Sequence, residues 1–228
     1  MNITPGRYPK ITALICTLNE EQNLPHVLPK IPPWVSEVLV VDGHSTDKTV
    51  EVARQIRPDI RILGQPGRGK GDALKYGIEQ STGDIVVMLD ADGNTDPAEL
   101  PRFVEPLLNG YDFAKGSRFL HTRPVKMPGH RRIGNWFLAR TTNLLFGTKY
   151  TDICSGYNAV WKKAWERIKF PIEFGYEPLI TIRAKRAGLR ICEVSCSDHG
   201  RINGHSKLPS WRQGWGALRA IIRERFHD

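Results

Sequence analysis

The sequence predicts an α/β fold in which helices flank both faces of a mostly parallel central sheet. Short apolar runs alternate with amphipathic segments through the first half of the 228-residue chain. Strands that alternate with helices form parallel sheets, because each helix carries the chain back to start the next strand. Polar clusters follow three of the apolar runs, which is where ligands bind in such sheets. Apolar residues make up 40% of the chain, enough for a core.

The first half supplies four predicted strands, Ile11–Cys16, Val38–Val41, Ile60–Leu63 and Ile85–Leu89. Amphipathic segments between them predict helices over Glu20–Leu28, Asp47–Ile56 and Asp72–Gln80. Another helix is expected to begin near Asp96. Its side chain can cap the helix, with Pro97 in the first position and Glu99 in the third.

The pattern is less regular after about Gly110. Helices are predicted over Arg131–Phe146 and over Glu177–Ala187, the latter ended by Gly188, with a strand over Leu189–Val194. No linker interrupts the chain. We therefore expect one domain over residues 1–208, with halves at 1–110 and 111–208, followed by an amphipathic tail over 209–228.

Composition limits the classes of function. The chain has 33 basic and 24 acidic side chains, a net charge of +9, which indicates nucleic acid, phosphates or a membrane surface as partner. We recognise no nucleic-acid-binding motif. No apolar run approaches the roughly 20 residues that span a bilayer, and the first ten residues lack a signal-peptide core. We expect a cytoplasmic protein, peripheral on the inner face of the membrane if it binds lipid, with four free cysteines.

Asp90-Ala91-Asp92 follows the apolar run Ile85–Leu89. Two carboxylates facing one site about 4 Å apart would repel each other by roughly 4 kcal/mol at an effective dielectric constant of about 20. A divalent cation removes that repulsion, and oxygen ligands suit Mg²⁺ or Mn²⁺ with substrate phosphates as further ligands. The alternative is a solvated turn with Asp92-Gly93 at its tip.

Asp42 ends a second apolar run, where an unpaired carboxylate suggests a role in binding. Ser45 and Thr46 follow it, and the alternative is that one of them only caps the next helix.

The segment Gly64–Gly71 almost matches the phosphate-binding loop of nucleoside triphosphatases. The final hydroxyl residue of that motif is replaced by Gly71, which argues against a kinase or hydrolase. Lys70 remains a candidate phosphate contact. A cluster of basic residues indicates a phosphate-bearing partner, because arginine binds phosphate in bidentate geometry; it comprises Arg118, Arg123, Lys126, Arg131, Arg132, Arg201 and Lys207.

Together these segments resemble the inverting family-two glycosyltransferases of the GT-A fold, and within that family the dolichyl- or polyprenyl-phosphate sugar synthases. The resemblance runs from about Ile11 to Leu208. The segments that carry it are Thr17–Glu20, Val40–Thr49, Gly69–Leu74, Met88–Asp92, Lys115–Arg118, Asp152–Tyr157 and Gly204–Leu208.

The resemblance implies a role for each matching position. Residues 1–110 would bind the nucleotide sugar, GDP- or UDP-linked. Its contacts would come from Thr17, Asn19, Glu20, Asp42, Lys70 and Asp90-Ala91-Asp92, with Asp90, Asp92 and Asn94 holding the metal. Arg118, Arg131, Arg201 and Lys207 would meet acceptor or donor phosphates. The chain departs from the family's pattern at two points. Relatives often have two adjacent aspartates where this chain has Asp42-Gly43. Relatives also often carry membrane-embedding helices after the catalytic domain, whereas this chain has the amphipathic tail over 209–228.

We therefore expect a metal-dependent hexosyltransferase that uses a polyprenyl phosphate. A phosphate acceptor is already an anion and needs little help from a base, whereas a hydroxyl acceptor would need a carboxylate. Glu177, then Asp152, are the candidate bases. The alternatives are a glycosyltransferase with a soluble or other lipid acceptor, and a nucleotide hydrolase or kinase.

The tail indicates attachment to a membrane surface. Apolar residues recur at the spacing of one helical face, with arginines between them; they are Trp211, Trp215, Leu218, Ile222 and Phe226. The alternative is that this face packs on the catalytic domain. If the tail binds the membrane, removing residues 210–228 should leave the melting temperature nearly intact.

Overall fold

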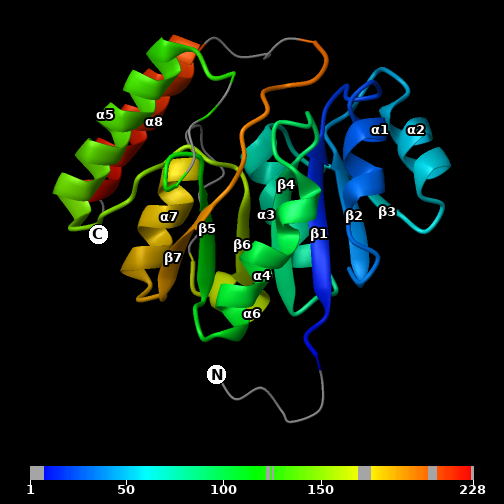
Figure 1. Cartoon of the computed structure of the whole chain (residues 1–228), viewed down its shortest axis with the longest axis horizontal. Helices are drawn as coiled ribbons and strands as arrows, with labels where there is room; N and C mark the ends of the chain where they lie inside the picture. Colours follow the sequence, from blue (N-terminus) through cyan, green and yellow to red (C-terminus); the bar gives the residue numbers. More distant parts are fainter. Residues whose placement is uncertain (1–7, 122–123, 125, 169–175, 205–209, 227–228) are drawn as a thin grey trace.

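The computed structural model describes residues 8–121, 124, 126–168, 176–204 and 210–226. Within these residues, seven strands form one sheet in the order β3-β2-β1-β4-β6-β5-β7 (Figure 1). β6 runs antiparallel to β4 and β5, and the other pairs are parallel. The predicted mostly parallel sheet is confirmed. The strands are β1 (Ile11–Thr17), β2 (Glu37–Asp42), β3 (Arg61–Gly64), β4 (Ile85–Asp90), β5 (Phe113–Ser117), β6 (Asn158–Trp161) and β7 (Ile191–Ser195).

Helices cover both faces of this sheet. The described α-helices are α1 (Leu24–Val27), α2 (Thr49–Ile56), α3 (Lys70–Gln80), α4 (Leu100–Leu108), α5 (Gly129–Phe146), α6 (Lys162–Trp165), α7 (Tyr176–Arg186) and α8 (Ser210–Phe226). Short 3₁₀ helices, η1 (Leu28–Lys30) and η2 (Pro97–Glu99), precede β2 and α4.

The structure corrects one predicted helix start, near Glu20, and confirms the capping role predicted for Asp96. The helix expected over Glu20–Leu28 is shorter, because Pro25 lies in the first turn of α1 and Pro29 at the start of η1. A proline belongs at a helix start and interrupts a helix interior, so the chain turns before Leu24 and tightens after Val27. At the other site, Asp96 accepts a hydrogen bond from the backbone N–H of Ala98, as its capping role predicts.

β5 and β6 were not predicted. β5 contains Lys115 and Gly116, so it has no apolar run, although Lys115 is only 1% exposed. β6 has four residues, too few to show a period. Its antiparallel direction ends the regular alternation of the first half.

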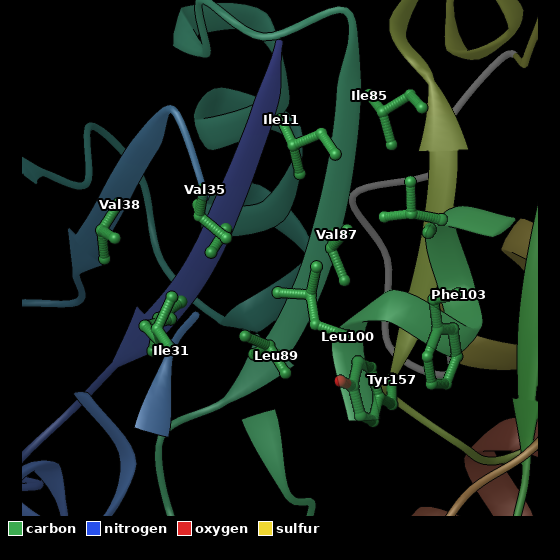
Figure 2. Packing of buried hydrophobic residues seen from close by; sticks show 14 of the residues in the cluster. Ile11, Ile31, Val35, Val38, Ile85, Val87, Leu89, Leu100, Phe103 and Tyr157 are labelled. Atoms are coloured by element: carbon green, nitrogen blue, oxygen red, sulfur yellow. The ribbon is translucent and has the colours of Figure 1, made fainter. Parts of the chain in front are cut away.

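Two apolar clusters form the core. Ile11 and Leu89 pack with Phe103 of α4 on one face of the sheet (Figure 2). Leu14 of β1 points to the other face and packs in a cluster with Ile180 of α7. This two-sided packing holds β1 and β4 in the centre of the molecule, so their carboxyl ends are rigid supports for side chains.

α8 packs beside α5 at the edge of the molecule (Figure 1). Ala217 and Ile221 are buried in a third apolar cluster with Leu138 of α5. Glu224 is 5% exposed and accepts hydrogen bonds from Nε and Nη2 of Arg183 on α7, each at 2.9 Å. One face of the tail therefore docks on the domain, but it is a different face from the one that carries the tryptophans.

Candidate active site

The carboxyl ends of β1, β2 and β4 lie side by side. Thr17 is the register partner of Asp42, and Cys16 is the register partner of Asp90. The polar residues that follow each strand are thus brought to one edge of the sheet, as the sequence predicts for a ligand site.

The Asp42 carboxylate is held by three hydrogen bonds. Thr17 Oγ1 donates to Oδ1 at 3.1 Å, and Ser45 donates through Oγ to Oδ1 at 2.6 Å and through its backbone N–H to Oδ2 at 2.9 Å. The expectation that Asp42 is unpaired was wrong, because Ser45 folds back onto it. The capping alternative was wrong too: α2 has Lys48 at its N-cap position and no side-chain cap. Asp42 is a rigid anion, 8% exposed.

The turn after β1 carries Asn19 and Glu20. Asn19 has a left-handed backbone with φ of 53°, and its Oδ1 accepts from the backbone N–H of Thr46 at 2.7 Å. Glu20 is 8% exposed and its Oε2 accepts from Asn23 Nδ2 at 2.6 Å. The bond between Asn19 and Thr46 ties the β1 turn to the β2 turn. A hollow beside them is lined by Leu18, Gly43, His44, Arg68 and Gly69.

Asp90 forms an ion pair with Lys70, which lies in the first turn of α3. Gly156 packs closely against both. A Cβ added to Gly156 would lie 2.8 Å from Asp90 Oδ2 and 3.2 Å from Lys70 Nζ. Ala91, 4% exposed, points into the core, so only its backbone is available to a ligand.

Asp92 contacts Arg201 from the segment after β7, with 3.5 Å between Oδ2 and Nη1. Burial raises the pKa of Asp92, and the charge of Asp90 adds to the rise, while the Asn94 N–H and the charges of Lys70 and Arg201 oppose it. Asn94 Oδ1, a predicted metal ligand, accepts from the backbone N–H of Gly200 at 3.1 Å.

These side chains fit a divalent cation that is shared with a substrate. Asp90 and Asp92 are hard oxygen donors whose mutual repulsion a cation would relieve. Within the part of the chain that the structure describes, no group of three or more His, Cys, Asp or Glu side chains could complete a metal site. The remaining ligands would have to come from elsewhere, and substrate phosphate oxygens are the usual source.

The glycine-rich loop is organised around Asp72 and not around an open phosphate cradle. Asp72 Oδ2 accepts from the backbone N–H of Gly67 and from Gln65 Nε2, each at 3.0 Å. A backbone amide that a triphosphatase would aim at phosphate is thus occupied by a carboxylate. This geometry argues against the kinase or hydrolase alternative.

Asp152 and Arg118 form a buried ion pair. Asp152 is 0% exposed and accepts from Arg118 Nε at 2.7 Å and from Nη2 at 3.0 Å. Burial opposes ionisation of Asp152, but the charge and hydrogen bonds of Arg118 outweigh it and hold the pKa of Asp152 below its usual value. A carboxylate this well satisfied is a poor general base, so the geometry does not favour Asp152 in that role. The Arg118 guanidinium, a predicted phosphate contact, likewise donates two hydrogen bonds to Asp152.

Two other predicted acceptor-side residues, Glu177 and Arg131, lie at the starts of helices. Glu177 lies half-buried in the first turn of α7. Its charge acts on the nearby Cys154 thiol: burial first, then the charges of Asp152 and Glu177, raise the pKa of Cys154 to about 12. Arg131 is exposed in the first turn of α5. Arg123 and Lys207 lie outside the described residues. All four cysteines are free thiols, as expected.

Asn23 and Asn203 are site residues that the sequence analysis missed. Asn203 donates its backbone N–H to Asn23 Oδ1 at 2.9 Å and accepts at its carbonyl from Asn23 Nδ2 at 3.3 Å. This reciprocal pair joins segments 180 residues apart. Asn23 comes three residues after Glu20, in the same turn, and that proximity was the available signal.

Comparison with known proteins places this site in a family. The model for "Glycosyl transferase family 2" matches residues 12–168, which include the carboxyl ends of β1, β2 and β4. The chain belongs to this family. It is 29% identical over 197 residues to "Glycosyltransferase AglJ" of Haloferax volcanii, covering 85% of this chain and 64% of AglJ, which is less than two thirds of that relative. It is also 31% identical over 214 residues to the "Undecaprenyl-phosphate mannosyltransferase" of Micrococcus luteus, covering 87% of each chain.

The fold is that of the GT-A glycosyltransferases, as predicted. The structure of glucosyl-3-phosphoglycerate synthase from Mycobacterium tuberculosis superimposes with a TM-score of 0.75 and 24% identity, covering 95% of this chain and 79% of that one. That protein was crystallised with Mn²⁺, UDP-glucose and phosphoglyceric acid.

Proposed function

We propose that this family-two glycosyltransferase moves a hexose from a GDP- or UDP-linked donor to a polyprenyl phosphate, with inversion at the anomeric carbon and with Mg²⁺ or Mn²⁺. The observation that carries the choice of acceptor is a pair of exposed, arginine-flanked apolar faces on α5 and α8. The relative of Micrococcus luteus named for undecaprenyl phosphate supports the same choice.

The strand-end residues supply the donor site. Glu20 and Asp42 are buried, fixed anions that suit the hydroxyl and N–H groups of a ribose and a base. Asp90 and Asp92 would hold the metal, and Mn²⁺ with UDP-glucose in the mycobacterial synthase supports this assignment. A bound metal would stabilise the negative charge that grows on the departing nucleotide diphosphate. Lys70 and Arg201 bring positive charge to the same place.

Most of the α8 face predicted for the membrane remains in solvent, whereas Leu218 is partly buried against the cluster that contains Leu138. Trp211 is 65% exposed, Trp215 61% and Phe226 81%, although the opposite side of the helix is docked. Large apolar side chains at such exposure, on one stripe of a helix, mark an interaction site. Arg212, which stacks on Trp211, and Arg219 lie beside this stripe and are exposed.

α5 presents a second apolar face of the same kind. Ile133 is 70% exposed, Trp136 61%, Phe137 51% and Leu144 85%. Their spacing puts them on one side of the helix, away from Leu138 and the core. α5 and α8 are packed neighbours, so two amphipathic helices share one edge of the domain (Figure 1).

The charges on these helices favour an anionic lipid surface. Residues 129–146 hold three arginines and no acid, and residues 210–226 hold four arginines and one acid, Glu224, which is already paired with Arg183. Each basic residue near an anionic leaflet contributes about 1 kcal/mol. In the described residues no helix is long and apolar enough to cross a membrane. We therefore propose peripheral binding at the inner face of the cell membrane.

A phosphate acceptor also fits the carboxylates. Asp152 is sequestered by Arg118, and a phosphate anion attacks without a base. Glu177 stays the candidate base for a hydroxyl acceptor. The second candidate function is transfer to a small phosphorylated acceptor, favoured by the mycobacterial synthase, which was crystallised with phosphoglyceric acid.

One transfer assay separates these functions. The enzyme would be incubated with Mn²⁺, radiolabelled UDP-glucose or GDP-mannose, and either undecaprenyl phosphate in anionic vesicles or phosphoglyceric acid in buffer. We expect label in the lipid phase with at least one donor. Label only in phosphoglyceric acid would establish the second candidate, and ATP turnover without sugar transfer would overturn both.

A further inference from the structure

Each carboxylate of the proposed metal pair already has a basic side chain as its counter-ion. Lys70 pairs with Asp90, and Arg201 contacts Asp92 with 3.5 Å between Nη1 and Oδ2. The two basic residues come from segments far apart in the sequence, Lys70 from the start of α3 and Arg201 from the segment after β7. The repulsion between Asp90 and Asp92 is thus offset by the protein itself.

Arg201 is held in place and is not a loose surface side chain. Its Nη2 donates to Glu20 Oε2 at 2.6 Å, and its Nε donates to the carbonyl of Asn203 at 2.7 Å. Asn203 is clasped in turn by Asn23, which also donates to Glu20. The arginine side chain is 20% exposed. It therefore bridges a donor-site carboxylate, Glu20, and a metal-site carboxylate, Asp92.

The backbone around Arg201 is fitted to the metal loop as well. The backbone N–H of Ile202 donates to the carbonyl of Asp92 at 3.1 Å. Gly93 has φ of 74°, and a Cβ placed there would lie 2.4 Å from Ile202 Cδ1. The positive φ favours glycine at this position, and a Cβ there would also push the end of the Ile202 side chain aside. Arg201 and Ile202 thus both contact Asp92, and Asn203 holds the Arg201 guanidinium.

We infer that Lys70 and Arg201 are exchangeable counter-ions: a divalent cation takes over the aspartates, and the displaced basic side chains take the donor diphosphate. This inference rests on the proposed function and deepens it. A metal ion that binds without nucleotide must break the contact between Arg201 and Asp92, and it then lies close to the positive guanidinium, which is unfavourable. When the nucleotide is present, the guanidinium can pair with the diphosphate in place of Asp92. Metal and nucleotide diphosphate therefore bind cooperatively, and by linkage each strengthens the other.

The inference makes opposite predictions for the two ligands of one variant. Arg201→Gln removes the competing charge, so Mn²⁺ without nucleotide should bind about tenfold more tightly, a difference of about 1.4 kcal/mol. The same variant should bind metal-free UDP or GDP about tenfold more weakly. A residue that only contacts phosphate would leave Mn²⁺ binding unchanged, and a residue that only supports the fold would weaken both.

The experiment is calorimetry of Mn²⁺ alone, UDP alone and GDP alone on wild type, Arg201→Gln, Arg201→Lys and Arg102→Gln, with thermal unfolding of each. Arg201→Lys keeps the charge and should bind Mn²⁺ as wild type does. Arg102→Gln removes one charge from α4, outside the site, and controls for net charge.

Tighter Mn²⁺ binding by Arg201→Gln alone supports the inference, including the case in which wild type shows no measurable binding. Unchanged or weaker Mn²⁺ binding by Arg201→Gln, or an equal gain in Arg102→Gln, overturns it. If UDP or GDP still binds in that case, the proposed function survives. If no protein binds Mn²⁺ or either nucleotide, the inference and the proposed function both fail.

Discussion

Replacing Trp211 and Trp215 by serine should detach the protein from anionic membranes without unfolding it. Both indoles are more than 60% exposed and lie on the stripe of α8 that faces away from the core. If membrane contact removes half of an indole surface of about 200 Å² from water, at about 25 cal/mol per Å², each contributes about 2.5 kcal/mol. Losing both, about 5 kcal/mol, should weaken binding by more than about 1,000-fold.

The assay is co-sedimentation with vesicles containing anionic lipid, at low and at high salt. Trp34→Ser is a matched control, since Trp34 is 46% exposed and lies before β2, away from α5 and α8. The control should bind as wild type, and raising the salt should weaken wild-type binding because the arginine contribution is screened. Wild-type binding by the Trp211/Trp215 variant, or no binding by wild type at low salt, would refute the membrane surface.

Point substitutions are a better test than deletion of the tail. Removing residues 210–228 would expose Leu138 and leave Arg183 without Glu224. The structure therefore predicts a lower melting temperature for the truncated chain, contrary to the expectation from the sequence. The reason is that α8 uses two faces, one for the domain and one for solvent.

Three further predictions concern the interior of the site. Asp92→Asn should reduce transfer at least about 100-fold with little change in melting temperature, and excess chelator should have the same effect; full activity in chelator would contradict the metal role. Asp42→Ala and Glu20→Ala should weaken nucleotide-sugar binding in calorimetry but not acceptor binding; unchanged donor affinity would remove both residues from the donor site. Asp152→Ala removes the carboxylate that pairs with the buried Arg118 guanidinium and should cost about 3–5 kcal/mol in urea unfolding. Because the folded pKa of Asp152 is depressed, the wild-type contribution should be complete above the unfolded value of about 3.9 and disappear as the pH falls through the lower folded value. An Asp152→Ala variant with wild-type stability, or one that loses the same free energy of unfolding at every acidic pH, would contradict the ion-pair account.

The meeting of the polar residues at the ends of β1, β2 and β4 could be predicted from the sequence because these residues follow strands. Asp42 and Asp90 end apolar runs, and parallel register brings such ends together regardless of loop detail. The glycine-rich loop could be recognised from the sequence as an incomplete triphosphatase motif, because Gly71 replaces the hydroxyl residue. The structure adds a physical reason, since the Asp72 carboxylate occupies the loop amide.

The pairings within the site could not be predicted in this way. Arg201 and Glu20 are 181 residues apart, and no local pattern links them. Lys115 is buried in β5 near Glu193, with 3.7 Å between Nζ and Oε1, although a lysine normally argues against a buried strand. Long-range charge pairs depend on the tertiary packing, which composition and periodicity do not encode at single positions.

The anomeric configuration of the product tests the central claim most directly. Purified enzyme would be supplied with Mn²⁺, an α-linked nucleotide hexose and undecaprenyl phosphate, and the lipid product would be analysed by NMR of its anomeric proton. A direct attack by the acceptor phosphate on the face opposite the nucleotide diphosphate predicts a β-linked hexosyl phospholipid. An α-linked product would contradict the one-step displacement, and the absence of any lipid-linked hexose would contradict the proposed acceptor.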